Sequence, residues 1–254
     1  MSQKFTSVVI TSFAKDHIEI YGNSFVKSYN LYCNVPLIIY AEDFTKNDLP
    51  GNYFCKNYYQ NAPLQKIFKE SLLKEMKILP FKEANRLEKG LRWSYKAFAI
   101  LHALQEVDAN LVIWMDADIK LFNSIPTNFF ENLIKNKLLL AYPQKIKNET
   151  HIESGLVIFN KLHKDINTLI NHYKLGYINQ EILKLNKPWD GFWLGKYTDN
   201  INYQSECILQ KPPLQDFKRY LIHNVGKDKF LNTKVNKYSG RDPNSYVSNG
   251  QKKR

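Results

Sequence analysis

The sequence predicts an α/β fold: one domain with a mainly parallel central sheet flanked by helices. Two observations predict it. Short apolar, β-rich runs over residues 5–13, 35–40 and 111–115 alternate with longer segments that have helical spacing, and such alternation favours parallel strands. The third run then ends in two carboxylates, Asp116 and Asp118, at the position where open α/β sheets bind their ligands.

The first half of the chain supplies most of the strands. The run over 5–13 is rich in β-branched residues and ends in small hydroxylated ones, as the first strand of a nucleotide-binding fold does. In the last helix before the carboxylates, the apolar residues are spaced three or four apart, namely Trp93, Ala97, Ile100 and Leu104. The predicted order is a strand over 5–13, a helix over 16–32, a strand over 35–40, a loop over 41–63, helices over 64–77 and 91–107, and a strand over 111–115.

The second half is predicted to complete one domain over residues 1–230. Its elements are a short strand over 119–122, a helix near 127–136, strands over 137–142 and 155–159, and a helix around 166–173. A segment over 188–197 is rich in aromatic residues and glycine. Periodicity fades beyond about residue 230, so residues 231–254 are expected to form a basic, flexible tail.

Composition excludes several classes of protein. An apolar fraction of 44% with 35 aromatic residues excludes a largely disordered chain. No apolar stretch approaches the roughly 18 residues of a membrane span, and the N-terminus lacks the layout of a signal peptide. Three widely separated cysteines form neither a disulfide framework nor a zinc site. We therefore expect a cytoplasmic protein, with peripheral attachment to the inner membrane face as a further expectation.

The positive charge is concentrated near the C-terminus. Residues 211–254 hold 11 Lys and Arg against 3 Asp, which is +8 of the total of +12. One interpretation is a solvated tail, and the other is attraction to phosphates of a nucleotide or of an anionic membrane surface. Nucleic acid is not expected as a partner, because the chain has no zinc-finger spacing or RNP-like aromatic motif.

The pair Asp116 and Asp118 is the main candidate for a metal site. Two carboxylates separated only by Ala117 can share a hard cation such as Mn²⁺ or Mg²⁺, which also binds phosphate oxygens. The alternative is a polar strand end that begins a turn. The preceding Trp114 and Met115 favour the metal site, because they carry the pair into a largely buried environment where charges need a counterion.

Four pieces in order resemble the GT-A glycosyltransferases, enzymes that use nucleotide sugars and carry an Asp-X-Asp metal motif. The pieces are a strand ending Ile10-Thr11-Ser12-Phe13, a lysine-bearing helix, Asp116-Ala117-Asp118, and His223-X-X-Gly226-Lys227-X-Lys229. The last piece is similar to the His-X-X-Gly-X-X-Lys element of the glycogenin and lipooligosaccharide galactosyltransferase group. One departure is that Phe230-Leu231 replaces the Pro-Trp that usually follows this element.

The resemblance implies a UDP-sugar donor, Mn²⁺ or Mg²⁺ as cofactor, and retention of the anomeric configuration. It implies metal ligation by Asp116, Asp118 and His223, although a lone histidine is more often a solvated or satisfied side chain. The implied donor-binding residues are Thr11, Ser12, Phe13, Arg92, Lys96, Asp116, Ala117, Asp118, Gly226, Lys227 and Lys229. Interpretations without a binding role stay open. In these, Thr11 and Ser12 simply end a strand, and Arg92 and Lys96 share a solvated face. Lys227 and Lys229 then belong to the basic tail.

Two carboxylates are the catalytic candidates, Asp190 and Glu153. In inverting enzymes of this fold a carboxylate from this half of the chain acts as general base on the acceptor hydroxyl, whereas in retaining ones it positions the donor sugar. The acceptor, a carbohydrate or another hydroxyl compound, is expected beside Ser154, Gly155, Trp189 and Gly191. Core packing is the alternative for the aromatic residues.

Two other functions remain. A nucleotidyltransferase such as a sugar-phosphate pyrophosphorylase would carry a glycine-rich N-terminal loop, and residues 11–18 contain no glycine. A non-catalytic carbohydrate-binding member of the fold would have no need for a complete set of metal ligands.

Overall fold

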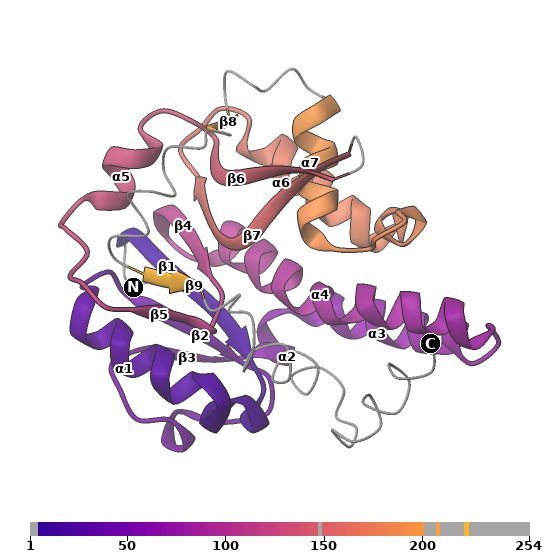
Figure 1. The fold of residues 1–254 in the computed structure, drawn as a ribbon, viewed down its shortest axis with the longest axis horizontal. Helices are drawn as coiled ribbons and strands as arrows, with labels where there is room; N and C mark the ends of the chain where they lie inside the picture. Colours follow the sequence, from indigo (N-terminus) through magenta and orange to yellow (C-terminus); the bar gives the residue numbers. More distant parts are fainter. Residues whose placement is uncertain (1–4, 147–148, 201–206, 209–220, 224–254) are drawn as a thin grey trace, which may run out of the picture.

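A computed structural model describes residues 5–146, 149–200, 207–208 and 221–223 (Figure 1). Its main sheet has seven described strands in the order β3-β2-β1-β4-β7-β6-β8. Their bounds are β1 Phe5–Phe13, β2 Leu37–Ala41, β3 Phe54–Asn57, β4 Ala109–Met115, β6 Leu139–Ile146, β7 Glu149–Asn160 and β8 Cys207–Ile208. A separate two-stranded sheet pairs β5 (Ile119–Leu121) with β9 (Leu221–His223).

The sheet is mainly parallel, as predicted. Strands β3, β2, β1 and β4 run parallel to one another, because each connection between them returns the chain to the same end of the sheet. The hairpin of β6 and β7 then adds antiparallel pairing on β4, and β8 pairs parallel to β6. All carboxyl ends of the parallel group therefore meet at one edge, beside the start of the turn that follows β4.

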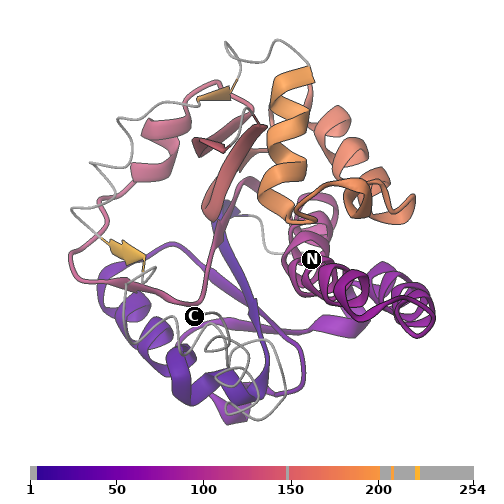
Figure 2. The ribbon, with the colours of Figure 1, turned by 45° about the vertical axis from the view of Figure 1, so that its right-hand side comes forward.

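Helices cover both faces of this sheet (Figures 1 and 2). Successive residues of the central strands alternate between two apolar cores, as the period of a strand requires. Val112 and Trp114 belong to the core under α4, α6 and α7, whereas Ile113 and Met115 belong to the core under α1 and α5. The helices are α1 Asn23–Tyr32, α2 Tyr58–Asn61, α3 Pro63–Met76, α4 Phe81–Glu106, α5 Phe129–Ile134, α6 Ile166–Ile178 and α7 Asp190–Asn200. The short helical turns are η1 Lys15–His17, η2 Ile18–Gly22, η3 Lys46–Asp48 and η4 Glu181–Lys184.

The prediction of a loop over 41–63 is wrong. This segment contains η3, the strand β3 and the helix α2. β3 is an edge strand of four residues whose ladder with β2 supplies its stability, so no apolar alternation marks it in the sequence. The helix predicted over 91–107 begins earlier, at Phe81. Its first residues project beyond the sheet (Figure 1) and are largely exposed, whereas Leu87 and Gly90 are already buried. In the segment over 188–197, α7 begins at Asp190.

Within the part of the chain that the structure describes, no helix combines the length and apolar character needed to cross a bilayer. The predicted tail over 231–254 lies outside the described residues.

Candidate functional site

A pocket opens at the edge where β1, β2 and β4 end, under the middle of α4. Because parallel strands place their carboxyl ends together, residues distant in sequence line it side by side. Among its lining residues are six predicted for donor binding: Ser12, Phe13, Arg92, Lys96, Asp116 and Ala117. Thr11 lies fully buried in β1 just before them, and Asp118 is also buried.

Lys96 is the centre of a buried ionic network. Its side chain is 6% exposed, and its ammonium group lies 2.9 Å from Asp116 Oδ1 and 3.7 Å from Asp190 Oδ2. The same group donates hydrogen bonds to the Ser154 carbonyl oxygen at 2.7 Å and to Ser154 Oγ at 3.1 Å. One cation thus joins α4, the turn after β4, β7 and the start of α7, and it brings together four residues that the sequence singled out.

The interpretation of Arg92 and Lys96 as one solvated face is wrong for Lys96. Lys96 lies on the buried side of α4, and its ammonium group lies 5.4 and 5.3 Å from the ring centroids of Trp93 and Trp114. Aromatic faces stabilise a nearby cation, and this contact adds to the two carboxylates. Arg92 forms an ion pair with Glu88 at 2.7 Å, one turn earlier on the helix, and also lines the pocket.

Asp116 is fixed by contacts on three sides. Trp114 Nε1 donates to Asp116 Oδ1 at 2.6 Å, and the Asp116 amide donates to the Gly155 carbonyl of β7 at 2.7 Å. Its own carbonyl accepts from Ile119 N at 3.0 Å and closes the turn that contains Ala117 and Asp118. The two carboxylates are therefore presented by a rigid turn rather than by an open loop.

The backbone of His223 lies beside this turn. In the β5–β9 ladder, Ile119 pairs with His223, so the residue directly after Asp118 faces a residue from the far end of the chain. The His223 side chain is not among the described ones, and Gly226, Lys227 and Lys229 lie outside the described residues. Within the described residues no group of three or more His, Cys, Asp and Glu is placed to hold a metal ion. The three-ligand set stays a prediction.

Asp190 is the first residue of α7 and is 2% exposed. Burial raises the pKa of this carboxyl, and the Lys96 ammonium and a hydrogen bond from Ser154 oppose that rise. The next residue, Gly191, lets the helix approach β7, since a Cβ there would lie 2.2 Å from the Ile152 carbonyl oxygen. The position of Asp190 thus depends on close backbone packing that no local sequence pattern reveals.

The residues predicted for the acceptor lie around the same network. Ser154 and Gly155 contact Lys96 and Asp116 directly. The Trp189 ring lies 6.2 Å from that of Trp93 on α4, and Glu153 Oε1 accepts from the Gly155 amide at 3.3 Å. The two predicted catalytic carboxylates therefore differ in their surroundings. Asp190 contacts the buried ammonium group of Lys96, whereas Glu153 contacts the backbone of β7.

Glu42 is a pocket residue that sequence reasoning missed. It follows β2 directly, and its Oε1 accepts a hydrogen bond from Ser12 Oγ at 3.0 Å. Burial raises the pKa of Glu42 to about 7, and the nearby charges of Asp43 and Asp16 add to the rise. Its place immediately after an apolar strand was the available signal, and the loop predicted from residue 41 onward obscured it.

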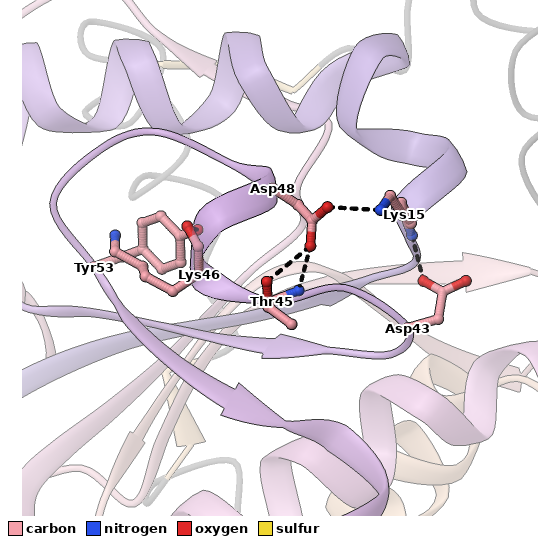
Figure 3. A network of polar contacts seen from close by, with 6 residues as sticks. All are labelled: Lys15, Asp43, Thr45, Lys46, Asp48 and Tyr53. Atoms are coloured by element: carbon pink, nitrogen blue, oxygen red, sulfur yellow. Dashed lines mark hydrogen bonds and ion pairs between the residues drawn. The ribbon is translucent and has the colours of Figure 1, made fainter.

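A polar network fixes the loops beside this pocket (Figure 3). The Lys15 amide donates to Asp43 Oδ1 at 2.5 Å, and the Lys15 ammonium lies 2.6 Å from Asp48 Oδ1. Asp48 also accepts from the Thr45 amide at 2.7 Å and so caps η3. The Lys15 ammonium and the hydrogen bonds from Thr45 lower the pKa of Asp48 to about 2. The loops after β1 and β2 are thereby joined where they border the site.

Comparison with solved structures identifies the fold of the protein. No family model matches the sequence, and no curated protein matches it. Mouse xyloside xylosyltransferase 1, in its apo form, is similar in structure with a TM-score of 0.50 at 10% identity, over 80% of this chain and 85% of that one. Core-mannan synthase A from Aspergillus fumigatus, in its Mn/GDP form, has a TM-score of 0.49 at 9% identity, over 81% of this chain and 73% of that one. The fold is that of the GT-A glycosyltransferases.

Proposed function

We propose that the protein is a glycosyltransferase that moves a sugar from a UDP-linked donor to a hydroxyl group of a carbohydrate or another acceptor, with Mn²⁺ or Mg²⁺ as cofactor. The observation that carries the proposal is the buried Lys96, held between Asp116 and Asp190 at the ligand-binding edge of the sheet. Lys96 and Asp190 are buried and Asp116 is partly buried. Removing charged groups from water costs free energy, and such groups collect at functional sites. The likeness of fold supports the same class.

The turn after β4 is the proposed metal site. Asp116 and Asp118 supply carboxylates, and the pairing of Ile119 with His223 brings an imidazole-bearing residue to the same turn. Oxygen donors with one imidazole suit Mn²⁺ better than Mg²⁺. When bound, the metal would neutralise diphosphate charge and make UDP a better leaving group.

Other residues of the chain are proposed to bind the nucleotide and the diphosphate. Ser12 and Phe13 border the pocket at the end of β1. We propose that this strand end contacts the base or ribose of the donor. Lys96 holds the Asp116 carboxylate in one orientation. Its positive charge would stabilise a diphosphate that leaves beside this carboxylate. Lys227 and Lys229 are proposed to contact the diphosphate as well.

Asp190 is proposed as the carboxylate nearest the reacting sugar. Lys96 connects it to Asp116. This contact would couple β7 and α7, the proposed acceptor side, to the proposed donor side. The pattern from His223 to Lys229 favours retention, in which Asp190 would position the donor sugar. Proton NMR of the first-formed product tests this point, since inversion of the anomeric signal would contradict it.

A thermal-shift panel tests the function. UDP with Mn²⁺ at 100 times its Kd should stabilise the protein by about 2.7 kcal/mol, which for a chain of this size raises Tm by several degrees. Asp118→Asn should lose the Mn²⁺-dependent part of this shift and leave the ligand-free Tm little changed. Asp165→Asn is the control, because Asp165 precedes α6 at the opposite edge of the sheet.

Other outcomes would contradict the proposal. Stabilisation by a nucleoside triphosphate instead of UDP would support a nucleotidyltransferase. No response to any nucleotide would support a non-catalytic module, and unchanged UDP–Mn²⁺ stabilisation in Asp118→Asn would refute the metal assignment.

A further inference from the structure

The connected ends of α3 and α4 form a projecting tip. α3 ends at Met76, α4 begins at Phe81, and Figure 1 shows this end of the pair extending beyond the sheet and the other helices. We call residues 74–82 the hairpin tip. Three of its side chains are apolar and exposed: Ile78 at 85%, Leu79 at 37% and Phe81 at 76%. They are nearly consecutive, whereas single exposed apolar residues elsewhere need no explanation.

Basic residues surround these apolar side chains. Lys74, Lys77 and Lys82 are all exposed, and none of them forms an ion pair with the described part of the chain. Glu75 also lies in the hairpin tip, so its three lysines give a formal net charge of +2. Glu83, the first acidic residue of α4, is held by Arg86 at 3.1 Å. The tip therefore combines an apolar end with lysines that are available to another surface.

We propose that the hairpin tip docks on an anionic lipid bilayer. Ile78 and Phe81 would enter the boundary between headgroups and acyl chains, and the flanking lysines would contact lipid phosphates. Exposed apolar side chains at the end of two helices, with a net positive charge beside them, match the apolar boundary and the negative charge of such a bilayer. A second copy of this chain would present the same positive charge and be repelled.

The geometry is compatible with the pocket staying open. Phe81 and Lys96 lie on the same helix, and fifteen residues of α-helix span about 22 Å. Contact with lipid at the tip would thus leave the site about four turns away from the bilayer surface, where it can receive an acceptor displayed on the membrane.

Vesicle co-sedimentation of the full chain tests this proposal. We expect binding to vesicles that contain phosphatidylglycerol, with little binding to phosphatidylcholine alone. The double variant Ile78→Ser with Phe81→Ser should weaken binding at least ten-fold. Leu31→Ser with Leu162→Ser is the matched control, since these side chains are 65% and 72% exposed elsewhere, and its binding should be unchanged.

A second pair of variants distinguishes vesicle binding by the hairpin tip from binding by the basic C-terminal residues. Every variant keeps those C-terminal residues. Each lysine near an anionic surface strengthens binding about five-fold, so Lys77→Gln with Lys82→Gln should weaken it by more than ten-fold. Lys27→Gln with Lys164→Gln, exposed lysines of other elements, should have little effect. Equal effects of the tip and control pairs, or no vesicle binding by the unaltered chain, would overturn the proposal. The proposal would also be overturned if Ile78→Ser with Phe81→Ser changed only the self-association of the protein, measured by sedimentation velocity without lipid.

Discussion

The ammonium group of Lys96 lies 2.9 Å from Asp116 Oδ1, and this buried ion pair joins the middle of α4 to the turn after β4. Asp190 lies on the other side of the same ammonium group at 3.7 Å. Two carboxylates from distant parts of the chain thus share one cation. Because charges in such a place are stable only together, removal of one member should reveal how much the site contributes to folding.

Lys96→Met should lower the free energy of unfolding by about 3–5 kcal/mol, because it leaves the buried Asp190 and the partly buried Asp116 without their cation. Urea denaturation measures this change. Lys184→Met is the control, since Lys184 forms an exposed ion pair with Glu181 at 2.7 Å, and its loss should cost less than about 1 kcal/mol. Similar losses in the two variants would show that the buried network adds no stability.

Asp190→Asn should lower the rate of UDP release from a UDP-sugar by about 100-fold or more. The amide keeps the shape of the side chain but loses its charge and its affinity for a proton. Stabilisation by UDP with Mn²⁺ should persist, since Asp190 is outside the proposed metal set. Asp165→Asn should leave turnover unchanged. Full activity in Asp190→Asn would exclude a catalytic or sugar-positioning role and leave Glu153 as the remaining predicted carboxylate.

Glu42→Gln should change how stability depends on pH. The pKa of Glu42 is about 7 in the folded protein and near 4.5 when unfolded, so the folded state binds the proton more tightly. Its contribution to stability is therefore complete below pH 4.5 and is lost as pH rises to about 7. Glutamine also accepts the Ser12 hydrogen bond without ionising, and it should stabilise the protein at pH 8 by up to about 3 kcal/mol.

Tm measured from pH 5 to pH 8 tests this prediction. The difference between Glu42→Gln and the unaltered chain should grow with pH and level off above pH 7. Glu153→Gln is the control. A difference that is constant with pH would show that Glu42 titrates at its ordinary pKa.

Gly191→Ala should destabilise the protein by about 1–3 kcal/mol, because the new Cβ would lie 2.2 Å from the Ile152 carbonyl oxygen and 2.8 Å from His151 Nε2. α7 must then shift and move Asp190. In Gly90→Ala the nearest atom is the end of the Leu183 side chain at 2.9 Å, which can rotate away, and alanine favours the helix. Calorimetry of both variants tests the contrast, and a larger loss at Gly90 would contradict it.

Local patterns predicted the framework well. The apolar runs became β1, β2 and β4, and the carboxylates after the third run lie at the predicted edge of the sheet. Strands with both faces buried must be apolar along their whole length, so their sequence identifies them without knowledge of their neighbours. The same reasoning failed for β3, whose stability comes from pairing at the edge rather than from its own residues.

The sequence did not predict which charged residues contact one another. The sequence selected Lys96, Asp116, Ser154 and Asp190 separately, and in the helical pattern Lys96 had a solvated alternative. Glu42 was not selected at all, because the loop predicted from residue 41 hid its place at the end of β2. Its raised pKa arises from burial, which only the folded chain produces.

The order of apolar and polar residues by itself determined the class of fold and the edge at which a ligand would bind, since burial of strands and the direction of parallel crossovers act on every segment locally. Only the tertiary structure decided that one lysine neutralises two distant carboxylates and that Ile119 pairs with His223. Electrostatic energies depend on distance and burial, and both are set by packing between segments far apart in the chain.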